Sequence, residues 1–403
     1  MRFENAYIPY GAYWSTPFCK WQGSFSHLHA MRFASDVARD AMQAKEIPAD
    51  ALDTVILGLT VPQKQSFYGA PWAAGLIGAE GVTGPMISQA CATSAKCIAH
   101  GAQEIDGGWR QTALVLTADR TSNGPHLYYP NPGGPGGTGA AEDWVMDNFG
   151  KDPFAKGSML QTAENVAKEA GIERAEQDEV ALIRYQQYQD ALKDDAAFHK
   201  RYMITPLEVK DASGRKVVGT VTGDEGVFPT TPEGLAKLRP VMEGGTVTFG
   251  AQTFPADGNC GIVMASRDRA KELSRDSNIE VSVITSGEAR AKKGFMAMAV
   301  VPAAKQALER AGVKVDELGA IKTHNPFAVN DVYMCRELGL GFDAINNYGS
   351  SLVFGHPQGP TGARLVVELI EELAMRGGGH GLFVGCAAGD TALALVLKVD
   401  VRS

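Results

Sequence analysis

The sequence lacks the features that mark several large classes of protein. No uncharged apolar run approaches the length of a membrane-spanning helix, so no membrane span is expected. No tract rich in Lys and Arg occurs and the formal net charge is −8 at pH 7, so nucleic acid is not an expected partner. The first residues carry no signal-peptide pattern, which favours a cytoplasmic protein.

Cysteine is scarce, and no two cysteines have the spacing of a metal-binding pair. The chain of 403 residues has six cysteines, and none belongs to a Cys-x-x-Cys pair. Neither a disulfide framework nor a zinc site is therefore expected, and no metal is predicted. A reducing compartment fits this usage, and in it a cysteine can remain a free thiol.

The composition, with 44% apolar and 21% charged residues, is typical of a globular protein. The chain is longer than a single hydrophobic core usually supports, so two or three domain-sized units are expected. In the first 121 residues, apolar β-branched runs alternate with stretches of helical spacing, which predicts an α/β layer with a largely parallel sheet. The expected strands are 53–60, 86–88 and 112–118, and the expected helices are 25–43, 72–78 and 95–105.

Residues 122–245 do not continue the alternation of strands and helices, and they are predicted to form a large insertion. Residues 123–142 are so rich in glycine and proline that no regular structure is expected there. Helices are predicted over 158–169 and 174–193, and a turn-rich stretch follows. An insertion of this size on an α/β scaffold usually shapes the ligand site.

After the insertion the pattern of strands and helices returns. Strands are expected over 246–252 and 258–265, and a second α/β unit follows. Its order of elements repeats that of the first unit, although no residue-level repeat is evident. Its expected strands are 279–284, 318–323, 381–386 and 391–399, and its expected helices are 302–311, 329–338 and 363–376.

Cys91 lies where a short apolar strand is expected to turn into a helix. Unpaired N–H groups and the positive end of the helix dipole surround such a position. They favour the thiolate, which is the nucleophilic form, so Cys91 is a candidate nucleophile. The competing interpretation is an inert buried cysteine, which is the commoner case.

His324, His356 and Cys386 are candidate partners, because each lies at a loop beside an expected sheet end, where function collects in α/β proteins. Taken singly, none is specific: His356 could merely cap the helix that follows it. The glycine-rich stretch 132–139 lacks the flanking features of a phosphate loop, so a plain loop is expected there.

Taken together and in order, these residues and several further segments resemble the thiolase family along nearly the whole chain. The matching positions are 15–20, Cys91, 162–167, 176–178, 235–240, 245–248, 257–258, 301–303, 355–357, 359, 362–364 and Cys386.

The resemblance implies a fold and a division of the chain. The fold is the thiolase fold, with two similar βαβαβαββ halves in a five-layer α-β-α-β-α arrangement and an inserted loop domain. The N-terminal half takes residues 1–121 and 246–270, and the C-terminal half takes residues 271–403. The loop domain, 122–245, carries the pocket for CoA and the substrate.

The resemblance also implies a chemistry. Thiolases are acyltransferases that exchange an acyl group between coenzyme A and a carbon chain. By resemblance, Cys91 is the nucleophile that forms an acyl-enzyme thioester, His356 activates it and serves an oxyanion site, Cys386 is the acid/base, and His324 belongs to the oxyanion site. Coenzyme A and acyl-CoA thioesters are then the substrates, and no cofactor is bound permanently.

The chain departs from the family pattern around this site. The usual Asn-Glu-Ala-Phe reads His-Asn-Pro-Phe at 324–327, which replaces an acidic residue by Asn325. Other departures are at Leu160, at 251–254 and at Ala388. The changes at Leu160 and 251–254 argue against a plain acetoacetyl-CoA enzyme and favour an unusual acyl group, branched or aromatic, in a degradative pathway. The resemblance to divergent thiolases with histidine at position 324 makes benzoylsuccinyl-CoA the most specific candidate. The residues expected to line the pocket are Asn325, Phe327, Met159, Leu160, Thr253, Phe254 and Ala388.

Two other functions remain open. One is a condensing enzyme of the ketoacyl-synthase kind that uses Cys91, His324 and His356; Cys386 argues against it, since such a synthase needs no cysteine acid/base. The other is a non-catalytic thiolase-like scaffold or lipid-carrier partner. By resemblance the chain forms a homodimer or tetramer, and divergent thiolases with histidine at this position often work with a small zinc- and OB-fold-containing partner subunit.

Overall fold

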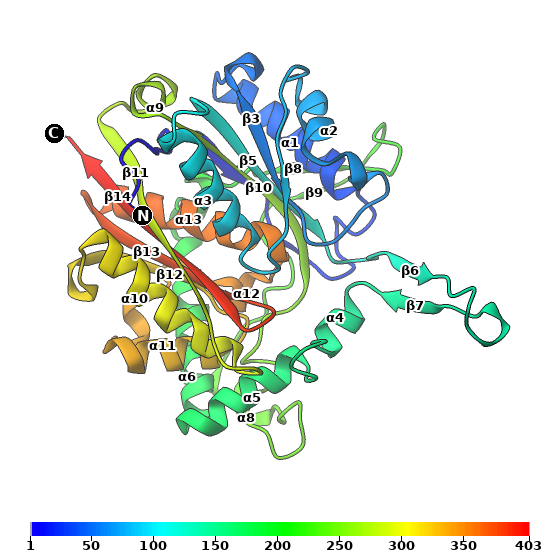
Figure 1. Cartoon of the computed structure of the whole chain (residues 1–403). Helices are drawn as coiled ribbons and strands as arrows, with labels where there is room; N and C mark the ends of the chain where they lie inside the picture. Colours follow the sequence, from blue (N-terminus) through cyan, green and yellow to red (C-terminus); the bar gives the residue numbers. More distant parts are fainter. Residues whose placement is uncertain (1, 403) are drawn as a thin grey trace.

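The computed structural model describes residues 2–402 and contains two main sheets that pack around a shared helical layer (Figure 1). The N-terminal sheet has the strand order β1-β10-β5-β3-β4, with β2 paired to β10. Strands β3, β4 and β5 run parallel, whereas β10 runs antiparallel to β1 and β5. Their bounds are β1 Tyr13–Ser15, β2 Cys19–Lys20, β3 Thr54–Gly58, β4 Met86–Ile87, β5 Thr112–Arg120 and β10 Ala256–Ala265.

The C-terminal sheet repeats this arrangement with the order β11-β14-β13-β12. Strands β12 and β13 are parallel, and β14 is antiparallel to both of its neighbours. The bounds are β11 Ile279–Arg290, β12 Leu318–His324, β13 Gly378–Ala387 and β14 Thr391–Val401. At the place equivalent to β4, the chain contacts β12 through the N–H of Asn346, which donates to the carbonyl of Ile321.

Helices form the other three layers. Helices α1 (Ala30–Ala44) and α2 (Gly69–Ile77) cover the outer face of the N-terminal sheet, and α10 (Val300–Ala311) and α11 (Ala328–Leu338) lie on the far side of the C-terminal sheet. Helices α3 (Thr93–Asp106) and α13 (Gln358–Met375) lie between the sheets (Figure 1). The chain therefore has the five-layer α-β-α-β-α architecture of the thiolase fold.

The inserted segment carries small elements of its own. Helices α5 and α6 correspond to the two helices that the sequence predicts there. The bounds are β6 His126–Tyr129, β7 Ala140–Asp143, α4 Met146–Gly150, α5 Met159–Ala170, α6 Arg174–Ala191, α7 Lys193–Ala196, β8 Leu207–Lys210, β9 Val217–Val221 and α8 Pro232–Lys237. The remaining helices are α9 Arg267–Leu273 and α12 Ser351–Phe354.

Two local predictions were wrong. Residues 123–142 are not irregular throughout, because β6 and β7 pair as an antiparallel hairpin that projects from the body (Figure 1). Most of the glycine and proline residues lie in its tip, between β6 and β7, and only Gly124 and Pro125 precede β6. Residues 246–252 form no strand: the Glu164 carboxylate accepts the N–H groups of Thr246 and Val247 at 2.8–3.0 Å, which takes the place of a ladder partner.

No helix within residues 2–402 is both long and apolar enough to cross a membrane, in agreement with the sequence.

Candidate active site

Cys91 lies in a tight loop between β4 and α3. Ala90, just before it, has a φ of 44°, a conformation that costs a residue with a side chain energy. The hydroxyl of Thr93 holds the loop by accepting the N–H of Gln89 at 2.8 Å and donating to the carbonyl of Ala90 at 2.7 Å. Cys91 is partly buried and lies just before the helix that the sequence predicts.

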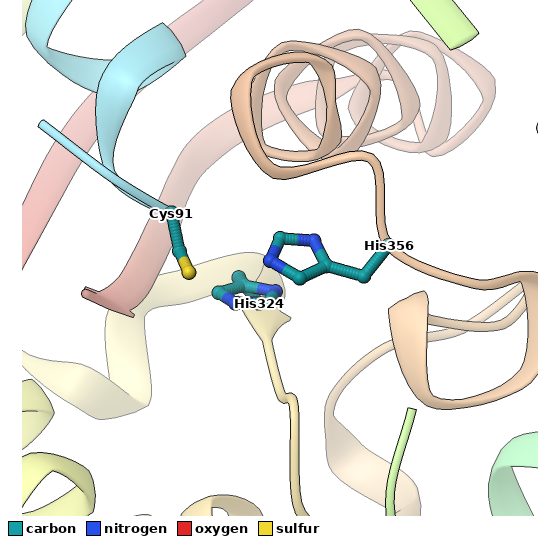
Figure 2. Close-up of side chains that lie close together, drawn as sticks. All are labelled: Cys91, His324 and His356. Carbon is teal, nitrogen blue, oxygen red and sulfur yellow. The ribbon is translucent and has the colours of Figure 1, made fainter. Parts of the chain in front are cut away.

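Two histidines from the C-terminal half meet this cysteine (Figure 2). His324 ends β12 and His356 precedes α13, and both side chains are buried. The Cys91 sulfur and one nitrogen of each imidazole lie within 4.8 Å of one another. The two rings stack with their centroids 4.0 Å apart. The structure thus brings Cys91 next to two histidines that lie more than 230 positions further along the sequence.

His356 is oriented to act as a base toward Cys91. The Thr361 hydroxyl lies 2.7 Å from the Nδ1 atom of His356 and donates its one hydrogen to the carbonyl of Pro357. The hydroxyl can therefore only accept from His356, so Nδ1 carries the proton and Nε2 has a lone pair. Nε2 has no hydrogen-bond partner among residues 2–402, and Figure 2 shows one ring nitrogen of His356 directed toward the Cys91 sulfur.

Cys91 is a protonated thiol at rest, which corrects the expectation of a thiolate. Burial raises its pKa to about 12, although the backbone N–H groups of Ala388 and Cys91 itself oppose the rise. Burial outweighs the helix dipole here, so a base must remove the proton as the sulfur attacks. Burial also lowers the pKa of His356 well below its usual value, which keeps the imidazole neutral and able to accept that proton.

Ala388 supplies a backbone donor without strain. Its N–H faces the Cys91 sulfur, and the left-handed residues of this turn are Gly389 and Asp390. The alanine at this position therefore does not have to adopt a positive φ. Two backbone N–H groups, of Cys91 and Ala388, form a second place where negative oxygen can be stabilised.

Cys386 is the second thiol of the site. It is fully buried at the end of β13, and the Asn330 amide group donates to its sulfur at 3.1 Å. Burial raises the pKa of Cys386 above its usual range, and the neighbouring Cys91 raises it further. Cys386 is therefore a proton donor at neutral pH, as an acid/base in the reaction requires.

A cavity of about 650 Å³ opens at Cys91 and His356. Five of the predicted pocket residues line it, namely Met159, Leu160, Thr253, Phe327 and Ala388.

Two predicted pocket residues lie outside this cavity. Asn325 is fully buried behind it, with its amide nitrogen donating to Asp331 at 2.7 Å. The carbonyl of Phe254 accepts the N–H of His356 at 2.9 Å, while its ring packs against Gly355. Both residues support the histidines instead of contacting a ligand in the cavity.

The sequence did not reveal one wall of the cavity. Residues 144–154, around α4, contribute Trp144, Phe149 and Phe154 to the lining. The indole N–H of Trp144 donates to the carbonyl of Thr60 at 2.9 Å, which anchors this wall to the N-terminal half. The aromatic residues of this segment were the available signal, but the glycine-rich stretch before them concealed it.

Cys91, His324 and His356 are also the three residues, among those described, whose donor atoms lie close enough to hold a metal ion. The two rings stack with an interplanar angle of 28°, so their nitrogens do not approach one point from separate directions as tetrahedral ligands do. The geometry suits proton transfer and hydrogen bonding better than metal binding.

Two thiols, two neutral imidazoles and the backbone N–H groups of Cys91 and Ala388 lie close together, and such a set of groups can support acyl transfer through a cysteine. Residues 12–268 match the family described as Thiolase, N-terminal domain, and residues 278–399 match Thiolase, C-terminal domain. The chain belongs to the thiolase family, and it is an acyltransferase.

Named relatives agree over nearly the full length. An acetyl-CoA acetyltransferase of Yarrowia lipolytica is 29% identical over 98% of this chain and 97% of its own. The beta-ketothiolase BktB of Cupriavidus necator is 30% identical over 93% of this chain and 95% of its own. The crystal structure of human mitochondrial 3-ketoacyl-CoA thiolase in complex with CoA superimposes with a TM-score of 0.88, at 26% identity and 99% coverage of both chains.

Proposed function

We propose that this protein cleaves a 3-oxoacyl-CoA with free CoA and that the acyl group it transfers is aromatic or branched. The observation that carries the proposal is the cavity, which begins at Cys91 and His356 and is walled by large apolar side chains. These walls include Trp144, Phe149 and Phe327, which suit a planar or branched hydrophobic group.

The first half-reaction makes an acyl-enzyme. Nε2 of His356 takes the thiol proton of Cys91 as the sulfur attacks the 3-oxo carbon. The bond between C2 and C3 breaks, and its electron pair passes into the enolate of the CoA thioester. His324 and His356 face that developing oxyanion. The Cys386 thiol protonates C2, which releases the shortened acyl-CoA.

The second half-reaction returns the enzyme to its starting state. The Cys386 thiolate removes the proton of the incoming CoA thiol, and the CoA sulfur attacks the acyl-Cys91 thioester. The tetrahedral oxygen is stabilised by the N–H groups of Cys91 and Ala388. Its collapse forms the new acyl-CoA, and the Cys91 sulfur regains its proton from His356.

The lining of the cavity carries little charge. Its polar side chains include the amides of Asn148 and Gln252, and no Lys or Arg is found among the described residues that line it. The one carboxylate, of Asp152, accepts the N–H groups of Phe154 and Ala155. An uncharged aromatic acyl group fits this wall directly, whereas the free carboxylate of benzoylsuccinyl-CoA depends on the neutral amides.

A substrate panel tests the proposal. The purified protein is assayed for CoA-dependent cleavage of benzoylacetyl-CoA, benzoylsuccinyl-CoA, a 2-methyl-3-oxoacyl-CoA and acetoacetyl-CoA. We expect kcat/KM for an aromatic or branched ester to exceed that for acetoacetyl-CoA at least tenfold. A preference for acetoacetyl-CoA contradicts the substrate class, and no cleavage of any ester contradicts the reaction.

A condensing enzyme of the ketoacyl-synthase kind is the second candidate, because Cys91, His324 and His356 form the cluster that such an enzyme uses. Decarboxylation of malonyl-CoA that persists in Cys386→Ala supports the synthase. Loss of C–C cleavage in Cys386→Ala, with Cys91 still acylated by a simple acyl-CoA, supports the thiolase.

We further propose a homodimeric or tetrameric assembly. Phe67 and Tyr68 are 91% and 67% exposed and lie in the segment that leads into α2. The next residue, Gly69, packs against Met86 on the edge strand β4. An apolar patch at a sheet edge supports contact with a second copy. Light scattering on the purified chain measures its mass, and co-purification from the native source tests for a small zinc-containing partner subunit.

A further inference from the structure

Ser351, the first residue of α12, lies behind the ring of His324. Its hydroxyl oxygen is 3.1 Å from Nδ1 of His324, 3.1 Å from the amide oxygen of Asn325 and 3.3 Å from the backbone N–H of Asn325. All of these groups are buried. The hydroxyl has one hydrogen. Its contact with the Asn325 amide oxygen has the geometry of a donation, but at 3.1 Å it is longer than the 2.7 Å contact through which Thr361 donates to Pro357, so Nδ1 of His324 competes for the same hydrogen.

The orientation of Asn325 is fixed by its other contacts. Its amide nitrogen donates to the Asp331 carboxylate at 2.7 Å, so its oxygen faces Ser351 and the N–H of Leu352, which lies 3.2 Å away. The Asn325 amide oxygen therefore keeps one donor, the N–H of Leu352, when the Ser351 hydroxyl turns to His324. Nδ1 of His324 has no partner within the described residues other than Ser351.

The acceptor to which the Ser351 hydroxyl donates decides whether Nε2 of His324 faces the substrate as an N–H or as a lone pair. Burial lowers the pKa of His324 to about 3, so the ring is neutral and carries one proton. If the hydroxyl donates to Asn325, the proton of His324 must sit on Nδ1, and Nε2 faces the site as a lone pair. If the hydroxyl donates to His324, Nε2 carries the proton and can donate to an oxyanion.

The neighbouring ring favours the second arrangement. The Thr361 hydroxyl already places a lone pair on Nε2 of His356, and the Nε2 atoms of both rings are buried with no partner in the described part of the chain. Two lone pairs in one buried space repel each other, whereas an N–H facing a lone pair is attractive.

We propose that Ser351 is a positioning residue that donates to Nδ1 of His324 and so holds the proton of that ring on Nε2, facing the reacting oxyanion. Two hydroxyls then keep the stacked histidines in opposite tautomers. Thr361 makes His356 a base for Cys91, and Ser351 makes His324 a donor. The proposal rests on the oxyanion role of His324 in the proposed function.

The first test reads the tautomer without any substrate. The full-length protein is labelled with ¹⁵N-histidine, and the His324 signals are assigned by their loss in His324→Asn. We expect Nε2 to be protonated in the wild type and the proton to shift partly or fully to Nδ1 in Ser351→Ala. A wild-type signal with the proton on Nδ1, or no change in Ser351→Ala, overturns the proposal.

The second test is kinetic, with benzoylacetyl-CoA and CoA as the probe substrates. Ser351→Ala is expected to lower kcat about 10- to 100-fold, approaching the loss of an oxyanion donor, with KM within about twofold. Ser351→Thr, which keeps the hydroxyl, is expected to retain most of kcat. Ser350→Ala is the matched control, because the Ser350 hydroxyl is equally buried but has no hydrogen-bond partner among the residues that the structure describes.

Double variants separate a tautomer effect from a loss of packing. In a His324→Ala background, Ser351→Ala is expected to cause no further loss of kcat, whereas additive losses overturn the proposal.

The rate at which iodoacetamide alkylates Cys91 is expected to fall in Thr361→Val and to stay unchanged in Ser351→Ala. If Ser351→Ala does not fold, Ser351→Gly takes its place in each comparison. A protein that cleaves no ester refutes the proposed function, while the ¹⁵N measurement still decides the tautomer.

Discussion

At the scale of the residue, burial governs the chemistry of the site. It raises the pKa of Cys91 to about 12 and lowers the pKa of His324 to about 3, so thiol and imidazole are both neutral at rest. A charged cysteine–histidine pair would have to be desolvated in this cavity, which is costly. The neutral pair avoids that cost and transfers its proton only as the sulfur attacks.

The neutral histidines predict an unusual acid limit of activity. An ordinary imidazole takes up a proton near pH 6.5, but burial, with a contribution from His324, moves the pKa of His356 well below that value. A lowered pKa keeps the base unprotonated at lower pH, so kcat/KM is expected to stay nearly constant from pH 8 to about pH 5. A pH–rate profile measures this, with circular dichroism at each pH to show that the protein stays folded. An acid limb centred between pH 6 and pH 7 contradicts the assignment.

At the scale of the element, α13 holds the site together. It lies between the two sheets, and every residue from Gly359 to Leu373 is buried, so its charged side chains need partners. Arg364 contacts Asp224 of the insertion at 2.6 and 2.8 Å and Glu368 of its own helix at 3.0 Å. His356 stands just before this helix, so the ion pairs that fix α13 also fix the base.

Removing one partner of this buried pair is expected to be strongly destabilising. Asp224→Asn leaves the Arg364 charge with one carboxylate instead of two, and both side chains are fully buried. The expected loss in the free energy of unfolding is about 3 kcal/mol or more. Denaturant unfolding measures it, with Glu169→Gln at the exposed Lys292 pair as the control. The control is expected to cost less than about 1 kcal/mol, and equal effects in the two variants contradict the argument.

At the scale of the whole molecule, Asp119 joins the two halves behind the active site. It lies near the end of β5 and accepts the N–H groups of Thr60 and Val61 from the N-terminal half at 2.8 and 2.9 Å. It also accepts the N–H of Gly359 at the start of α13, at 2.6 Å. Burial nevertheless outweighs these hydrogen bonds and raises the pKa of Asp119 to about 6.

The raised pKa of Asp119 predicts how stability depends on pH. Between an unfolded pKa of 3.8 and a folded pKa of about 6, the folded protein holds a proton that the unfolded chain has lost. The stabilisation of the folded protein by protonated Asp119 is therefore present in full below pH 3.8 and is lost as the pH rises through 6. Relative to Asp119→Asn, the free energy of unfolding of the wild type is expected to fall by roughly 2 to 3 kcal/mol from pH 4 to pH 7. Denaturant unfolding of both proteins at each pH measures the difference, and a difference that does not change with pH contradicts the shift.

The sequence by itself determined the architecture and the identity of the reacting side chains. Apolar runs and helical spacing located the strands and helices of both halves, because burial in a layered fold requires those patterns. The ordered motifs around Cys91, His356 and Cys386 identified the family, since a reaction fixes the types of its groups and a shared fold keeps their order along the chain.

The tertiary structure alone decided the states of those groups. Whether Cys91 rests as a thiol depends on desolvation by residues that are distant in the sequence. The tautomer of His356 depends on a Thr361 hydroxyl whose hydrogen is already given to Pro357. The missing strand at 246–252 and the cavity wall at Trp144 likewise follow from contacts made by Glu164 and Thr60. Such effects depend on distances in space, which local sequence patterns do not contain.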